Sequence, residues 1–144
     1  MRAVIQRVQR AEVRAGEDIE EIGPGLVVLA GIEAEDTEET VDWAAAKIAG
    51  LRVFEDDQGR MNLGFPEVGG EILAVSQFTL AGSIAKGRRP SFDTAMAPEP
   101  ARLLFERFVE RLRAEGVPVK TGWFQRHMEV ELVNDGPVTF VLER

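Results

Sequence analysis

The sequence predicts an α+β fold: a single domain over residues 1–144, with mixed or antiparallel strands and two main helices. Residues 26–32 form an uninterrupted apolar run of strand length, which is typical of a strand buried on both faces. Only residues 36–50 and 98–116 carry apolar side chains at helical spacing. The strand segments therefore do not alternate regularly with helices, which argues against a doubly wound parallel sheet.

The amino-terminal segment predicts three strands. Residues 2–15 alternate β-branched and polar side chains, as a strand does. A turn follows at residues 16–18, and residues 19–22 form a second strand that runs back along the first. We expect these two segments to form a strand pair. Gly23-Pro24-Gly25 then separates the pair from the apolar strand at residues 26–32.

Two segments predict helices. Asp36 with Glu39 is typical of a helix start, and Gly50 fits the end of that helix. Pro98 opens the second helix, which Gly116 ends. The apolar stripe of this second helix consists of Leu103, Leu104, Phe108 and Leu112.

The rest of the chain predicts further strands and one long loop. The strand-like segments are residues 51–54, 72–80, 117–120, 128–133 and 138–142. Gly136-Pro137 predicts a turn between the last two of them. Residues 81–97 show no clear period, and a loop of that length inside a small domain is usually functional or mobile.

The composition is that of an ordinary globular domain in a reducing compartment. Of the 144 residues, 44% are hydrophobic and 29% charged, a balance that argues against disorder. There is no cysteine, which excludes disulfides and thiolate zinc sites. The first residues lack the apolar core of a signal peptide, and no segment reaches the roughly 20 apolar residues of a membrane span. We therefore expect a cytoplasmic protein without membrane contact.

The sequence carries none of the common phosphate-binding or catalytic motifs. Gly23-Pro24-Gly25 lacks the third glycine and the lysine of nucleotide-binding loops. His127 is the only histidine and no His/Asp/Glu spacing recurs, so we expect neither a metal site nor a cofactor. A triad of Ser76, His127 and Asp135 can be drawn, but Ser76 does not stand in a Gly-x-Ser-x-Gly elbow and nothing places His127 beside it.

Small polar residues remain as candidates. In a strand, Gln77 and Thr79 would point to one face while Phe78 and Leu80 point to the other. From the pattern alone, this could equally be the polar face of an edge strand.

The charge distribution allows only limited contact with nucleic acid. The net charge is −8, whereas phosphate contacts normally come from Lys and Arg. Lys86, Arg88 and Arg89 nevertheless cluster within the long loop. On charge pattern alone, such a cluster indicates a solvated loop. Binding of a single terminal nucleotide, however, needs few basic residues.

Two segments make the chain resemble the D-aminoacyl-tRNA deacylase family of bacterial type. They are Ser76-Gln77-Phe78-Thr79-Leu80 and Asn134-Asp135-Gly136-Pro137-Val138-Thr139, which are similar to the two signature motifs of that family. The resemblance extends in the expected order through residues 1–8, 22–26, 47–63, 68–73 and 89–92, and so covers essentially the whole chain. It implies an enzyme that hydrolyses the ester linking a D-amino acid, or glycine on the wrong tRNA, to tRNA.

The resemblance also implies a homodimer with two active sites at its interface. In the family, the Gly-Pro bond is cis and the dipeptide enters the partner's pocket, where its carbonyl groups exclude L-amino acids by steric clash. Carried over, Gly136 and Pro137 are this chirality filter. The expected partner is the aminoacylated 3′ end of tRNA, whose terminal adenosine would lie against Phe124 and Met128.

The expected chemistry needs no nucleophile from the protein. The ester is activated, so positioning and donors aimed at the developing oxyanion could drive its hydrolysis. The resemblance assigns this role to Gln77, Phe78 and Thr79, with Ser76 binding substrate. The alternative is Thr79 as a covalent nucleophile, although no base is evident to activate it. The tRNA contacts are expected at Lys86, Arg88 and Arg89.

The chain departs from the family pattern at two places in the loops. An acidic residue, a threonine and a basic residue are common in the family where this chain has Ser83, Ile84 and Ala85. The family commonly has Gly-Ala where this chain has Gln125-Arg126, and Arg126 could replace the charge lost at Ala85. A function of another class stays open: a non-catalytic module that binds RNA 3′ ends with the same pocket.

Overall fold

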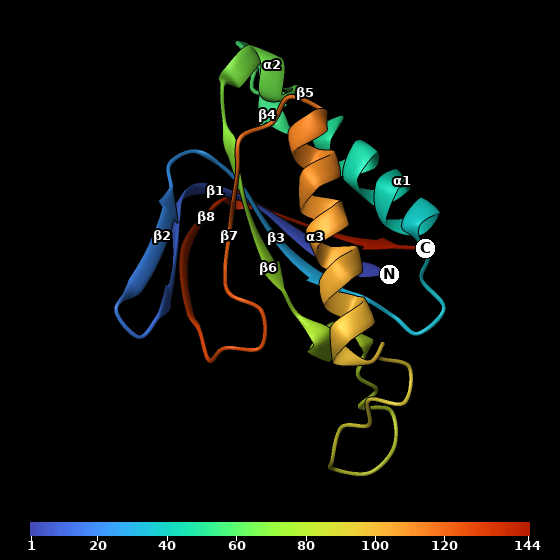
Figure 1. Cartoon of the computed structure of the whole chain (residues 1–144). Helices are drawn as coiled ribbons and strands as arrows, with labels where there is room; N and C mark the ends of the chain where they lie inside the picture. The colour runs from blue at the N-terminus through green and yellow to red at the C-terminus, as the bar shows by residue number, and fades with distance from the viewer.

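A twisted six-stranded sheet with two helices on one face forms the body of the molecule in the computed structural model, which describes residues 1–144 (Figure 1). The strands are β1 (Arg2–Ala15), β2 (Asp18–Ile22), β3 (Gly25–Gly31), β4 (Phe54–Glu55), β5 (Met61–Leu63), β6 (Glu71–Ser76), β7 (Val119–Thr121) and β8 (Glu129–Glu143). The helices are α1 (Glu38–Ala49), α2 (Phe65–Val68), α3 (Pro98–Ala114) and the 3-10 helix η1 (Phe78–Ala81). The predicted α+β class is confirmed.

The long strand β1 organises the sheet. One of its edges pairs antiparallel with β8 along most of its length, and its other edge pairs antiparallel with β3 and then with β2. Beyond β3, strands β6 and β7 follow in parallel, which makes the sheet mixed as predicted. β4 and β5 form a separate small hairpin. The expectation for residues 26–32 is confirmed, because β3 lies between two strands and almost all of its residues are buried.

The core has two parts, one on each face of the sheet. The larger part lies under α1 and α3, where side chains such as Ile48, Phe108 and Leu112 meet Ile5 and Leu26 from the strands. The smaller part lies on the opposite face, where Val13, Val27 and Leu73 pack beneath Trp123 and Met128. The second face is therefore closed by the loop between β7 and β8, and this loop also contributes to the site described below.

The helices follow the predicted segments, with one correction at the start of α1. Thr37, and not Asp36, caps this helix: its side chain accepts from the Thr40 N–H, and the Thr40 side chain accepts from the Thr37 N–H. α1 and α3 are joined by Arg107, which donates to both carboxylate oxygens of Asp42 at 2.8 and 2.7 Å and lowers the pKa of Asp42. None of the helices is both long and apolar enough to cross a membrane.

Two predicted elements are wrong at the motifs of interest, and the strand predicted over residues 51–54 overlaps β4 only at Phe54. The strand predicted over residues 72–80 ends at Ser76, and the chain then turns into η1. The turn predicted at Gly136-Pro137 is a bulge inside the single strand β8, because β1 is long enough to pair with β8 on both sides of the dipeptide. The short elements β5 and α2 were not predicted.

Candidate active site

The end of β6 is held by backbone hydrogen bonds to β3. The Gln77 N–H donates to the Ala30 carbonyl at 2.8 Å, and the Leu80 N–H donates to the Gln77 carbonyl at 3.2 Å to begin η1. The Gln77 side-chain amide donates to the Thr79 hydroxyl at 2.5 Å. Gln77 and Thr79, which we expected to share the face of a strand, therefore meet across a turn instead.

Gly31 lets the chain approach this turn closely. A Cβ atom at position 31 would lie 2.8 Å from the Gln77 carbonyl oxygen and 2.9 Å from the Leu80 Cβ, both shorter than real contacts of this kind. Only glycine fits between β3 and η1 without moving the backbone. The position of the Gln77-Phe78-Thr79 segment thus depends on a residue at the end of the neighbouring strand.

A hollow of about 730 Å³ opens beside the end of β6, which is a size typical of small-molecule sites. The strand end supplies Ser76, Gln77 and Phe78 to its wall. The β7–β8 loop supplies Phe124 and Met128, so the hollow unites five of the residues predicted to bind or cleave substrate. Its further lining comes from Ile32, Phe92, Met96, His127 and seven neighbours, and is mostly apolar.

The β7–β8 loop is fixed on both sides. The Trp123 N–H donates to the Met128 sulfur at 3.3 Å, and Gln125 adopts a left-handed backbone with φ of 59°. Arg126 donates to the Asp18 carboxylate at 2.7 Å and to the Ala15 carbonyl at 2.6 Å. The charge of Arg126 is thus neutralised at the β1–β2 turn, which does not favour our expectation that it replaces charge lost at Ala85.

The Gly136-Pro137 bulge lies opposite Arg7. Gln6 pairs with Thr139 and Val8 pairs with Asn134, so the residues between them arch away from β1. The Gly136-Pro137 peptide bond is cis, and both residues are exposed. Neither lines the hollow of its own chain.

Arg7 anchors this bulge from below, with only 4% of its side chain exposed. Its Nε donates to the Asp135 carbonyl at 3.2 Å, its Nη1 to the Val53 carbonyl at 2.8 Å, and its Nη2 to the Glu55 carboxylate at 3.1 Å. The three branches of one planar guanidinium therefore tie the bulge to the β4–β5 hairpin.

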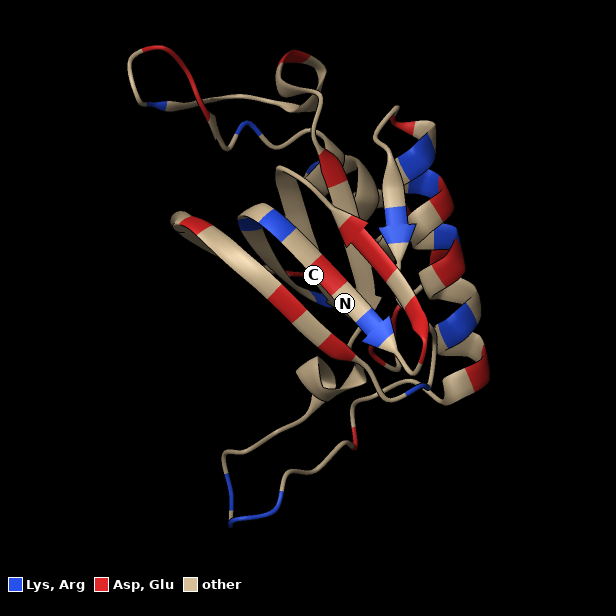
Figure 2. Cartoon of the chain, turned by 90° about the vertical axis from the view of Figure 1, so that its left-hand side faces the viewer, with Lys and Arg blue, Asp and Glu red and all other residues tan.

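Beyond Ala81, where η1 ends, the long loop predicted at residues 81–97 contains no helix or strand, but it is braced internally. Ser83 and Ser91 exchange two backbone hydrogen bonds at 2.8 and 3.0 Å, and the Thr94 hydroxyl donates to the Ala81 carbonyl at 2.7 Å. The segment between the two serines projects from the body of the molecule with Lys86, Arg88 and Arg89 on it (Figures 1 and 2). These three residues do not line the hollow.

Comparison with known proteins decides the family. The sequence model described as "D-Tyr-tRNA(Tyr) deacylase" matches residues 4–143, which is nearly the whole chain. The chain belongs to the D-Tyr-tRNA(Tyr) deacylase family. The resemblance seen in the two motifs is confirmed at this level, and the chain is accordingly assigned to a family of hydrolases.

Several members of this deacylase family are closely similar to the chain. A D-aminoacyl-tRNA deacylase of Symbiobacterium thermophilum is 60% identical over 99% of this chain and 95% of the relative. One of Pelobacter propionicus is 58% identical over the full length of both chains. Among solved structures, a "c-Myc DNA Unwinding Element Binding Protein" has a TM-score of 0.92 at 42% identity, covering 100% of this chain and 99% of that one. A probable eukaryotic D-amino acid tRNA deacylase has a TM-score of 0.84 at 20% identity, covering 98% and 97%, and shares the fold.

Within this deacylase-family chain, the triad considered from the sequence is not formed. Ser76 and His127 both line the hollow, but Asp135 lies in the bulge, where its carboxylate is 3.4 Å from Arg7. Sequence reasoning also missed Gly31 and Arg7 as supports of the two motifs. A glycine inside an apolar strand is a signal of close backbone approach and could have pointed to Gly31.

Proposed function

We propose that the chain is a cytoplasmic D-aminoacyl-tRNA deacylase, acting as one domain over residues 1–144. The observation that carries the proposal is the hollow in which the Ser76–Phe78 strand end faces Phe124 and Met128. The terminal adenosine lies against Phe124 and Met128, and the aminoacyl ester lies at the strand end. Glycine mischarged on tRNA is a second substrate, because it has no side chain to exclude.

Catalysis rests on position and on hydrogen-bond donors. Phe78 and Thr79 begin η1, so their N–H groups have no partner within that turn and are the donors that we assign to the oxyanion. Water adds to the ester carbonyl, the tetrahedral oxyanion collapses, and the ribose oxygen leaves with a proton. The Gln77 side chain, fixed by its hydrogen bond to Thr79, orients the reacting ester.

Incubation of purified protein with D-Tyr-tRNA, L-Tyr-tRNA and glycyl-tRNA tests this function. We expect release of free tRNA from the D-Tyr and glycyl esters and stability of the L-Tyr ester. Equal rates with and without protein for the D-Tyr ester would contradict the proposal.

A binding module without turnover is the second candidate. The 42% identical structure bears a name that describes binding to a DNA element, which favours a role in nucleic-acid binding. The same incubation separates the two candidates, because a binding module would protect the D-Tyr ester from spontaneous hydrolysis while a deacylase shortens its lifetime.

The Thr79 hydroxyl is expected to be dispensable for bond cleavage. It accepts from the Gln77 amide, and no base lies within hydrogen-bond reach of it in the structure. Thr79→Ala should therefore lower kcat by less than about 10-fold, far from the roughly 10⁶-fold cost of removing a true nucleophile. Single-turnover deacylation of D-Tyr-tRNA measures this, and a stable acyl ester trapped on Thr79 would overturn the assignment.

The chirality filter is proposed to be the Gly136-Pro137 bulge, acting in the pocket of a partner subunit. The bulge is exposed, it lies outside the hollow of its own chain, and Arg7 holds it rigidly. Its strand also leaves large apolar side chains uncovered: Val130, Phe140 and Val141 are 40%, 39% and 67% exposed. An apolar strand at the edge of a sheet is a surface that needs a partner.

We therefore expect an obligate homodimer of two-fold symmetry, since a filter supplied across an interface cannot work in a monomer. Sedimentation should show one active species of twice the single-chain mass of 15.9 kDa. An active, L-rejecting species at the single-chain mass would contradict the cross-subunit filter.

The phosphate contacts with tRNA beyond the terminal adenosine are proposed to be few and to come from Lys86, Arg88 and Arg89. Each neutralised phosphate of a single strand adds about −0.7 to the slope of log affinity against log salt. We expect a slope corresponding to about three phosphates in the native chain, and a clearly shallower slope when all three residues are changed to Ala. Arg60→Ala, on the exposed β4–β5 turn, serves as the control. A native slope implying eight or more phosphates would contradict this binding mode.

A further inference from the structure

A second hollow of about 430 Å³ lies between α3 and the β7–β8 loop. It shares Phe124 and Arg126 with the first hollow, so these two side chains form a wall between the two spaces. Its volume falls within the range of about 300–1,000 Å³ that is typical of small-molecule sites. Because the two hollows share this wall, a ligand that fills the first hollow has the second as its neighbour.

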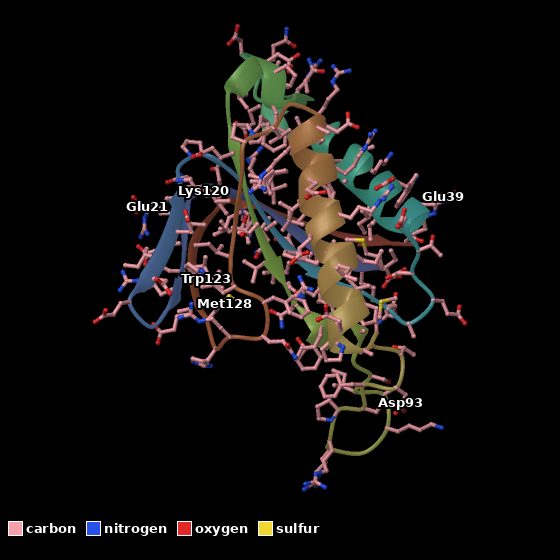
Figure 3. All side chains as sticks on the ribbon, viewed as in Figure 1. Glu21, Glu39, Asp93, Lys120, Trp123 and Met128 are labelled. Carbon is pink, nitrogen blue, oxygen red and sulfur yellow. The ribbon has the colours of Figure 1, made fainter.

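The wall of the second hollow carries a guanidinium plane that lies over an aromatic ring. The Arg126 guanidinium lies 5.4 Å from the centre of the Trp123 ring. Asp18 and the Ala15 carbonyl fix Arg126 from one side, and the second part of the core supports Trp123 from the other. Figure 3 shows Trp123 beside Met128 on the same loop. Unpaired bases stack on aromatic rings and on guanidinium planes.

The rim of the second hollow carries a carboxylate suited to an amino group. Glu106 is paired with Arg102, which lies 2.5 Å from both Glu106 and Glu99. Glu110 lines the same hollow, is exposed, and takes part in none of the ion pairs made by α3. Carboxylates accept hydrogen bonds from the N4 amino group of cytosine, which uracil lacks.

We propose that the second hollow is a subsite for the cytidine that precedes the terminal adenosine of tRNA. The base stacks on the Arg126 guanidinium, which Trp123 supports from below, and Glu110 accepts from its amino group. The inference rests on the proposed deacylase function and deepens it: the enzyme reads the last two nucleotides of its substrate, and not the terminal adenosine alone.

Short substrates test this subsite without the rest of the tRNA. The D-Tyr esters of adenosine, of the dinucleotide CpA and of UpA differ only in the nucleotide under test. We expect kcat/KM to be about 10-fold higher for the CpA ester than for the adenosine ester, mainly through KM, since base stacking contributes ~1–3 kcal/mol. The UpA ester should gain less than the CpA ester.

Matched variants locate the effect. Trp123→Ala should bring the ratio of kcat/KM for the CpA and adenosine esters close to one. Trp43→Ala should leave that ratio unchanged, because Trp43 forms a similar pair with Arg144, at 4.8 Å, but lies on α1 outside both hollows. Glu110→Gln should equalise the CpA and UpA esters, and Glu115→Gln on the same helix end should not.

The possible failures are distinguishable. If none of the three esters is hydrolysed, the deacylase function itself is wrong and the subsite falls with it. If the adenosine and CpA esters are hydrolysed with the same kcat/KM, the deacylase function stands and the subsite is overturned. A ratio that Trp43→Ala reduces as much as Trp123→Ala does would equally overturn it.

Discussion

Gly31→Ala is expected to lower kcat/KM for D-aminoacyl-tRNA by about 100-fold, because catalysis by positioning is lost when the reacting groups move by about 1 Å. The added Cβ would lie 2.8 Å from the Gln77 carbonyl oxygen and 2.9 Å from the Leu80 Cβ. Backbone atoms cannot rotate away as a long side chain can, so η1 must shift. Deacylation of D-Tyr-tRNA at subsaturating concentration measures the loss.

Gly23→Ala is the matched control for this variant, because a Cβ at position 23 meets no atom within 4 Å. Both variants should be compared by circular dichroism and thermal unfolding to establish that they are folded. A folded Gly31→Ala protein with native kcat/KM would show that the position of η1 does not limit the reaction.

Arg7→Met is expected to raise the rate of hydrolysis of L-aminoacyl-tRNA, relative to that of D-aminoacyl-tRNA, by about 100-fold or more. This is the discrimination that a precisely placed steric contact can supply. The substitution removes the donor to the Asp135 carbonyl and leaves the Val53 carbonyl, already buried, without its partner. The bulge is then free to move, and under the proposed filter the space closed to an L side chain opens. Paired assays with D-Tyr-tRNA and L-Tyr-tRNA give the ratio.

Arg7→Lys keeps the charge but not the planar fork, so it should give an intermediate ratio. Arg10→Met is the control, because Arg10 lies on the same strand but pairs only with the exposed Glu131. If the Arg7→Met protein is folded and still rejects L-Tyr-tRNA as strictly as the native protein, the bulge does not determine chirality.

Much of the fold could be predicted because its elements are marked locally. The apolar run at residues 26–32, the helical spacing after Asp36 and the proline start at residue 98 each have a short-range cause, and each element was found. The errors arise where distant residues decide. η1 interrupts the strand after Ser76 where β3 itself ends, at Gly31, and the sequence around Ser76 holds no sign of this.

In the candidate site too, features marked in the local sequence could be predicted and features decided by distant residues could not. Ser76, Gln77, Phe78, Phe124 and Met128 were expected at one site from the family motifs, and they do line one hollow. Their supports were not foreseen, because Arg7 acts through carbonyl groups of Val53 and Asp135 that lie far away in the sequence. A backbone carbonyl carries no signature in a sequence, so the anchor of the bulge becomes visible only in the structure.

A heterodimer of two variants tests most directly whether the filter acts across the subunit interface. One subunit carries Gly31→Ala, with a damaged pocket and an intact bulge, and the other carries Arg7→Met, with an intact pocket and a loosened bulge. In a cross-subunit arrangement, the intact pocket receives the intact bulge. The heterodimer, purified through two different affinity tags, should then hydrolyse D-Tyr-tRNA at about half the native rate and reject L-Tyr-tRNA as the native dimer does. Hydrolysis of L-Tyr-tRNA at half the rate of the Arg7→Met homodimer would show that each bulge filters its own pocket, and would contradict the account.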